Sequence, residues 1–278
     1  MTQSAAAAEK LAETVAEGVR QLLAGADWQH LLQLASRMPS YSARNLLLLW
    51  IQGQRRGISP THVAGYRRWA ELGRQVRRGE TALRILAPVT YREEPDPKTG
   101  EPGRRVVRGF RSAAVFDVSQ TNGPDLPATP QLLAGSAPVE LWSALSALLV
   151  ADGYRIERGD CGEANGWVEY SSRVVRIRAD VDELQATKTL AHELAHVQAD
   201  HENRGPGIGR ARREIEAESI ASVLLQAHGL DSAEYTLPYV AHWAGGDAQK
   251  VLESLDTVAR TSNAILTKLT AHVASQTA

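Results

Sequence analysis

The sequence contains little cysteine, phenylalanine or methionine, and it has no long hydrophobic run. Its 278 residues include two phenylalanines, two methionines and a single cysteine, Cys161. One thiol excludes a disulfide framework and a cysteine-based zinc cluster, and it fits a reducing, cytoplasmic compartment. No stretch of 18 apolar residues is present, so we expect no membrane-spanning helix and no membrane partner. The N-terminus also lacks the basic start and apolar core of a signal peptide.

The charge is unevenly distributed along the chain. Residues 41–111 hold 15 Lys and Arg against 6 Asp and Glu, a net charge of +9. Residues 131–278 hold 13 against 20, a net charge of −7. A basic half beside an acidic half predicts a polyanion-binding module joined to a domain of another kind.

A predicted helix near residue 190 carries a pattern that binds metals. His192 and His196 belong to an HExxH sequence, and residues four apart lie on one face of a helix. Both imidazoles can therefore bind one Zn2+ ion, while Glu193 acts as general base on the water that the ion acidifies. Asp182 as N-cap, with Gln185 at the capping-box position, supports the helix.

A third ligand is expected from the next predicted helix, which starts near Arg212 after a Gly/Pro-rich loop at residues 205–209. Glu214 and Glu218 are four residues apart and share a face of that helix. This spacing predicts one metal ligand and one acceptor for a histidine N–H. An acidic first turn that favours the helix dipole is the alternative explanation.

The basic region interleaves arginines with Tyr66 and Trp69. Arginine neutralises phosphates, and aromatic rings stack on bases of any sequence, so the pattern favours binding of single-stranded DNA. The alternative is that Trp50 and Trp69 lie in the core and the arginines form a solvated face. Residues 83–89 and 105–116, which follow, are predicted strands.

The HExxH sequence and the later Glu214-x-x-Ala-Glu218 resemble the zincin domain of ImmA/IrrE-type metallopeptidases. The resemblance implies that Glu214 is the third metal ligand and Glu218 its outer partner, with Glu216 and Glu218 as substitutes for the ligand.

Three further blocks, at residues 41–49, 65–80 and 116–121, look like the N-terminal domain of ArdC antirestriction proteins. The resemblance spans roughly residues 10–128 and implies binding of single-stranded DNA. ArdC proteins also carry a C-terminal zincin domain, so both halves imply one family. We predict that DNA is contacted by residues of the first two blocks: Tyr41, Arg44, Asn45, Tyr66, Arg67, Trp69, Arg74, Arg77 and Arg78.

We therefore predict an α+β protein with an ArdC-like domain at residues 1–128, a linker at 129–138 and a zincin-like domain at 139–278. Residues 174–178 are predicted to be either an edge strand that holds an extended peptide or a strand packed in the core. Tyr235, Tyr239 and His242 are the candidate donors to the oxyanion of a tetrahedral intermediate, with Tyr239 and His242 ranked first and a structural role as the alternative.

The predicted function is that of an antirestriction-type protein linked to mobile DNA. It binds single-stranded DNA and carries a zinc-dependent metallopeptidase fold that acts on a protein substrate. One alternative is a non-catalytic DNA-binding protein in which zinc is structural. The other is a regulatory peptidase that cleaves a repressor, which the lack of a helix-turn-helix pattern disfavours.

Overall fold

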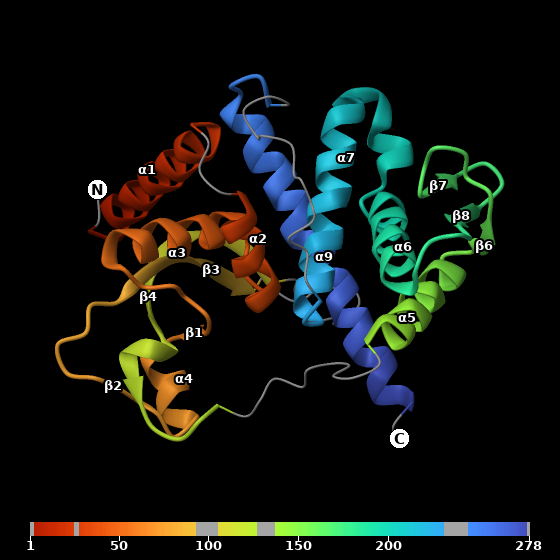
Figure 1. The fold of residues 1–278 in the computed structure, drawn as a ribbon. Helices are drawn as coiled ribbons and strands as arrows, with labels where there is room; N and C mark the ends of the chain where they lie inside the picture. The colour runs from red at the N-terminus through yellow and green to blue at the C-terminus, as the bar shows by residue number, and fades with distance from the viewer. Residues whose placement is uncertain (1–2, 25–27, 93–104, 127–136, 231–243, 277–278) are drawn as a thin grey trace, which may run out of the picture. The chain divides into compact units, whose positions relative to one another are not determined.

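The chain divides into two compact units (Figure 1). In a computed structural model, the structure describes residues 3–24, 28–92, 105–126, 137–230 and 244–276. Unit 1 comprises Met1–Gln21 and Arg44–Leu126, and unit 2 comprises Leu22–Ala43 and Pro127–Ala278. Residues 22–43, which the sequence-based boundaries place in the first domain, thus cluster with the second. Helices and strands occur in both units, which confirms the α+β class.

Two helices of unit 1 pack at a glycine. Helix α1 (Gln3–Leu23) crosses α3 (Ala43–Arg56) at Gly18, where an added Cβ would lie 3.2 Å from side-chain carbons of both Leu47 and Ile51. The four leucines at residues 46–49 of α3 are fully buried. A side chain at position 18 would therefore require Leu47 and Ile51 to shift by a few tenths of an ångström.

The sheet of unit 1 has the order β1-β4-β3, with β1 (Val63–Ala64) and β3 (Leu83–Arg92) both antiparallel to β4 (Arg105–Asp117). Strand β3 is therefore an edge strand. Asn45 and Gln52, two turns apart on α3, hydrogen-bond the backbone of that edge. The Asn45 amide bonds Leu86 N and O at 2.9 and 3.0 Å, and the Gln52 amide bonds Arg84 N and O at 2.9 and 2.8 Å. The two amides thus stand where a neighbouring strand would be.

A smaller layer of unit 1 contains α4 (Tyr66–Glu71), the 3-10 turn η1 (Val118–Gln120), and the paired strands β2 (Gln75–Val76) and β5 (Thr121–Asn122). Trp69 is fully buried here, and its indole N–H donates to the carbonyl oxygen of Phe116 at 3.0 Å. The Arg74 guanidinium is also buried, and it donates to Thr121 Oγ1 at 2.8 Å and to the carbonyl of Pro124. Both side chains therefore hold the layer together.

Helix α6 (Glu183–Gln198) lies at the centre of unit 2. It packs against α5 (Ala137–Ala151), α7 (His201–Ala227) and α9 (Ala248–Gln276). Helix α2 (Trp28–Arg37) joins this unit on α7, where the Trp28 indole donates to Ser219 Oγ at 3.0 Å in the core. No helix among the described ranges has the length and apolar character that crossing a membrane requires.

The sheet of unit 2 has the order β6-β8-β7, formed by β6 (Arg155–Gly159), β7 (Gly166–Glu169) and β8 (Val174–Arg178). Strand β8 is parallel to β6 and antiparallel to β7. The prediction that residues 174–178 form an edge strand is wrong. Val174, Val175 and Ile177 are buried, as expected of a central strand with neighbours on both sides.

Helix α7 corrects a second prediction. Residues 205–209, expected as a loop, belong to a helical segment that runs from His201 to Ala227. Its one non-helical residue is Gly209, at φ 70° and ψ 161°, and positive φ is a conformation that glycine adopts at little cost. The change of direction is therefore concentrated in one residue, and the turns that carry Glu214 and Glu218 follow it.

The amides of Asn45 and Gln52 yield a stability prediction. Replacing either residue with leucine should destabilise unit 1 by about 1–3 kcal/mol, because the backbone groups of Leu86 or Arg84 then lose their partners. Urea denaturation checks this, with the exposed Gln54→Leu change on the same helix as the matched control. Equal midpoints for Gln52→Leu and Gln54→Leu would contradict it.

Candidate metal centre

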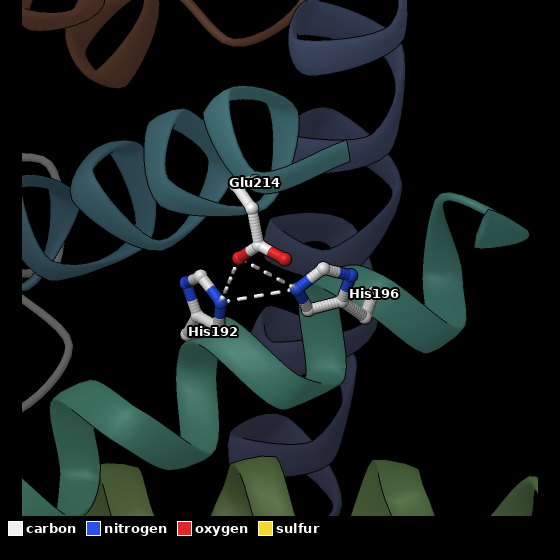
Figure 2. Close-up of side chains that lie close together, drawn as sticks. All are labelled: His192, His196 and Glu214. Atoms are coloured by element: carbon white, nitrogen blue, oxygen red, sulfur yellow. Dashed lines mark hydrogen bonds and ion pairs between the residues drawn. The ribbon is translucent and has the colours of Figure 1, made fainter. Parts of the chain in front are cut away.

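Two histidines on α6 and one glutamate on α7 bring three electron-rich atoms together (Figure 2). His192 Nε2 and His196 Nε2 lie 3.0 Å apart. Glu214 Oε2 lies 3.5 Å from the first nitrogen and 3.7 Å from the second. All the candidate ligand atoms are within 4.8 Å of one another, so one cation can contact all three. The predicted set His192, His196 and Glu214 thus converges in space.

Helix α6 is fixed at its start and along its inner face. Asp182 caps it by accepting a hydrogen bond from Gln185 N at 2.8 Å, as the sequence predicts. The Gln185 side chain does not complete the capping box but donates to Thr189 Oγ1 at 3.3 Å. Ala186, Leu190 and Leu194 are fully buried, so the opposite face presents the histidines.

Glu218 lies one turn after Glu214 and contacts His192 from behind. Its Oε2 atom is 3.0 Å from His192 Nδ1. A carboxylate only accepts hydrogen bonds, so Nδ1 carries a proton, and in the neutral ring the lone pair of Nε2 faces the centre. This arrangement, a histidine ligand that donates its other N–H to a carboxylate, is usual at metal sites. Glu214 thus faces the Nε2 atoms of both histidines, whereas Glu218 contacts His192 Nδ1.

The charges of the centre respond to burial and to one another. Burial lowers the pKa of His192, but the contacts with Glu214 and Glu218 outweigh it and raise that pKa to about 10 in the metal-free protein. His192 and His196 hold the pKa of Glu214 well below its usual range. Burial raises the pKa of Glu193 to about 7, although nearby His192 opposes the shift. A centre this rich in acceptors suits a cation bound by nitrogen and oxygen.

A cleft of about 330 Å³ opens beside the centre. Asn165 and Gly166 form one wall, and Lys188, His192 and Glu193 lie on the α6 side. Gly166 allows this close approach, because an added Cβ would lie 2.5 Å from Thr189 Cγ2 and 2.9 Å from the Arg176 carbonyl oxygen. Glu193 therefore faces the same cavity as the candidate ligand His192.

Sequence reasoning missed two residues near the centre. Lys188, four residues before His192, is almost buried in the wall of the cleft. His201, five residues after His196, is fully buried and contacts His196. The helical spacing of Lys188 was a usable signal, whereas His201 lies beyond the turn at Asp200 and gave none. Tyr235, Tyr239 and His242, the candidate oxyanion donors, lie outside the described residues.

The predicted DNA-contacting residues are placed unevenly. Trp69, Arg74 and Asn45 are buried and bonded inside unit 1, as described above, so they offer no face to a base or phosphate. This is a correction: three side chains that fit a binding pattern serve the fold. Tyr41 is half-buried, and the exposed members of the set are Arg44, Tyr66, Arg67, Arg77 and Arg78. Arg77 is paired with Glu80 at 2.6 Å.

The hairpin β3–β4 exposes a further group of aromatic and basic side chains. Tyr91 and Phe110 are 42% and 54% exposed, although large apolar residues are usually covered. Arg108 lies over the Tyr91 ring at 5.0 Å, and Arg84 and Arg111 are exposed on the same two strands. We call Tyr91, Phe110, Arg84, Arg108 and Arg111, which lie on both faces of this hairpin, the hairpin surface.

Comparison with known proteins agrees with this two-part arrangement. Residues 4–118 match the family model of the N-terminal domain of anti-restriction factor ArdC. Residues 152–250 match that of the IrrE N-terminal-like domain, a peptidase M78 family. The chain therefore combines an ArdC-like first domain with an IrrE-like second domain.

Solved structures share the fold of the ArdC-like chain. The Mn(II)-bound crystal structure of antirestriction protein ArdC from plasmid R388 is 18% identical, with a TM-score of 0.56 over 93% of this chain and 97% of that one. The metal-free crystal structure of the same protein is 20% identical, with a TM-score of 0.52 over 83% and 85%. Metal binding is thus a property of a protein with this fold.

Two curated relatives match over less than half of their own length. An uncharacterized protein of Bacillus anthracis is 23% identical over 86% of this chain and 47% of its own length. An uncharacterized protein of Sinorhizobium fredii is 32% identical over 33% of this chain and 32% of its own length. The ArdC-like chain therefore spans about half the length of the first relative, and less of the second.

Metal binding can be tested by thermal unfolding. Zn2+ or Mn2+ should raise the melting temperature of unit 2, because binding to the folded state alone adds about 2.7 kcal/mol at a concentration 100-fold above Kd. His196→Ala should remove the shift, and EDTA should reverse it in the unmodified chain. The control is Glu183→Gln, an exposed carboxylate on the same helix. A full shift in His196→Ala would refute the assignment.

Proposed function

We propose that the IrrE-like domain is a zinc-dependent hydrolase of peptide bonds and that the ArdC-like domain binds single-stranded DNA. The observation that carries the first part is the meeting of His192, His196 and Glu214 at a cleft that Glu193 also lines. Two nitrogens and one carboxylate form the ligand set of many catalytic zinc sites, which keep a further position for water.

The chemistry follows from the positions of these side chains. A divalent ion held there acidifies water and polarises a carbonyl. Glu193 is ionised in part near neutral pH, because burial raises its pKa to about 7, and it accepts the proton of the attacking water. As the C–N bond breaks, the same carboxyl group returns that proton to the leaving amine. His192 and His196 keep their lone pairs toward the centre throughout.

The DNA-binding part of the proposal rests on the hairpin surface and on the exposed arginines of unit 1. Tyr91 and Phe110 can stack on unpaired bases, and Arg84, Arg108 and Arg111 can neutralise phosphates. Arg67 and Arg78, from the set predicted earlier, add exposed positive charge in the same unit. This combination favours single strands, whose bases are free to stack, over duplex DNA.

The proposed cellular role is protection of incoming mobile DNA from restriction, in the cytoplasm, with a protein substrate for the cleft. The likeness of residues 4–118 to the N-terminal domain of ArdC supports it. A restriction-protection assay in a restricting host tests it: expression of the chain should raise the yield of an unmodified incoming plasmid. An unchanged yield would remove the antirestriction role and leave the two biochemical activities to be judged alone.

Glu193→Gln separates hydrolysis from metal binding. Peptide hydrolysis should fall by about 10²–10⁴-fold, because the amide cannot take the proton of water, while metal content stays near that of the unmodified chain. A peptide-library cleavage assay and elemental analysis measure the two. Glu183→Gln serves again as control. Loss of hydrolysis with protection intact would favour the alternative in which the metal is structural, and undiminished hydrolysis would refute the role of Glu193.

Variants of unit 1 test the DNA-binding surface. Tyr91→Ala and Phe110→Ala should each weaken single-strand binding by about 1–3 kcal/mol per stacked base. Arg67→Ala with Arg78→Ala should instead lower the salt dependence of binding by about one to two phosphate contacts. Fluorescence anisotropy at several salt concentrations distinguishes the effects. Val107→Ala, an exposed apolar change on the same hairpin, is the matched control and should be neutral. Equal affinity for all variants would place the DNA elsewhere.

A further inference from the structure

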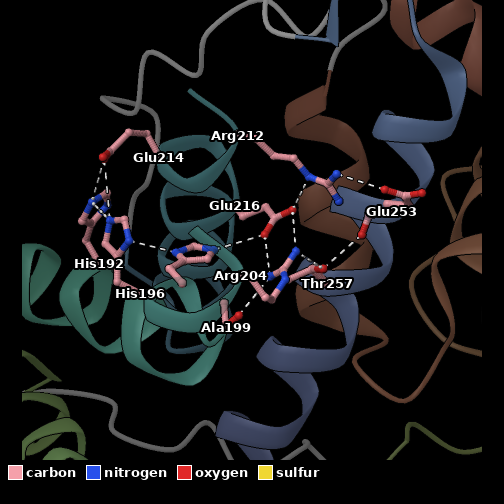
Figure 3. A network of polar contacts seen from close by, with 10 residues as sticks. His192, His196, Ala199, Arg204, Arg212, Glu214, Glu216, Glu253 and Thr257 are labelled. Atoms are coloured by element: carbon pink, nitrogen blue, oxygen red, sulfur yellow. Dashed lines mark hydrogen bonds and ion pairs between the residues drawn. The ribbon is translucent and has the colours of Figure 1, made fainter. Parts of the chain in front are cut away.

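His201 is a buried histidine that the proposed reaction does not use. It is the first residue of α7 and has no exposed side-chain surface. Its Nδ1 atom lies 2.8 Å from His196 Nδ1, and its Nε2 atom lies 3.1 Å from Glu216 Oε2. Figure 3 shows His196 and the contacts of Glu216 with Arg204 and Arg212. The His201 ring therefore bridges the outer side of a candidate metal ligand and a buried carboxylate.

The protonation state of Glu216 follows from the groups that contact its carboxyl group. Arg204 donates to Glu216 Oε2 at 2.9 Å, and Arg212 Nε donates to Oε1 at 2.9 Å. Two guanidinium groups around one fully buried carboxyl group keep it ionised, and an ionised carboxylate only accepts hydrogen bonds. The contact with His201 must therefore be a hydrogen bond donated by His201 Nε2–H.

The donor and acceptor of the hydrogen bond between His196 and His201 are then determined. In the neutral form of His201 that we propose, the one N–H is on Nε2, so Nδ1 is an acceptor. His196 Nδ1, 2.8 Å away, must donate to it. The other nitrogen of His196, Nε2, then has a free lone pair directed toward His192 Nε2 and Glu214. The opposite tautomer of His196 would place an N–H bond in the centre and exclude a cation.

We propose that His201 and Glu216 form a positioning relay that fixes His196 in the Nδ1–H tautomer and in its ring orientation. The inference rests on the proposed function, in which His196 is a metal ligand. His192 is held by Glu218 directly, whereas His196 is held by a carboxylate one imidazole further away. Arg204 and Arg212 also contact Thr257 and Glu253, so α9 anchors the far end of the relay.

Metal affinity tests the relay. His201→Phe keeps an aromatic ring but removes the acceptor for His196 Nδ1–H, and it should weaken Zn2+ binding by about 10–100-fold in chelator competition. His201→Gln should recover part of the loss, because its amide oxygen can accept from His196 while its NH₂ group donates to Glu216. His228→Phe is the matched control, a buried histidine that bonds the Leu224 carbonyl oxygen at 2.7 Å and should leave affinity unchanged.

Nuclear magnetic resonance of the metal-free protein provides an independent readout. Long-range ¹H–¹⁵N spectra should assign Nδ1–H to His196 and Nε2–H to His201, and His201→Phe should abolish the uniform tautomer of His196. An Nε2–H on His196, or two protons on His201, would overturn the relay. Equal Zn2+ affinity for His201→Phe and His228→Phe would also overturn it. If the unmodified chain binds no metal, the proposed hydrolase fails, while the spectra still decide the relay.

Discussion

The structure of unit 2 depends on one electrostatic constraint: two imidazole nitrogens and a carboxylate oxygen are held so close together that each controls the protonation of the others. Two imidazole lone pairs and a carboxylate oxygen meet where α6 passes α7. Their convergence requires that the outer nitrogen of each ring be the protonated one. Glu218 holds the proton on Nδ1 of His192, and the relay of His201 and Glu216 holds it on Nδ1 of His196.

The groups of the centre are held in place by contacts that extend from α6 through α7 to α9. Burying Glu216 would be costly alone, because an ion without partners in a protein interior is strongly destabilising. Arg204 and Arg212 supply the compensating charge, and their further contacts with Thr257 and Glu253 tie the cluster to α9. The contacts that pack α7 against α9 are thus connected to those that orient His196. We therefore expect a substitution at Thr257 or Glu253 to alter the orientation of His196.

Several local patterns were read correctly from the sequence, whereas the loop expected at residues 205–209 and the features that distant contacts decide were not. The Asp182 cap and the facing of His192 and His196 depend only on residues within a turn or two, and the spacing of Glu214 and Glu218 gave their common face. The central place of β8 depends on strands paired with it from both sides, which local spacing cannot show. Trp69 and Arg74 fit a binding surface by composition, yet tertiary hydrogen bonds bury them. His201 was missed because the chain reverses at Asp200 before reaching it.

The two amides of α3 that cover the outer edge of β3 have a consequence for how this protein behaves in solution. An uncovered strand edge recruits other strands, and aromatic residues beside it increase that hazard. Asn45 and Gln52 occupy the pairing positions of Leu86 and Arg84, so the first half of β3 cannot extend its sheet with a strand from another molecule. The hairpin can therefore expose Phe110 and Tyr91 to solvent without promoting self-association through that stretch of backbone.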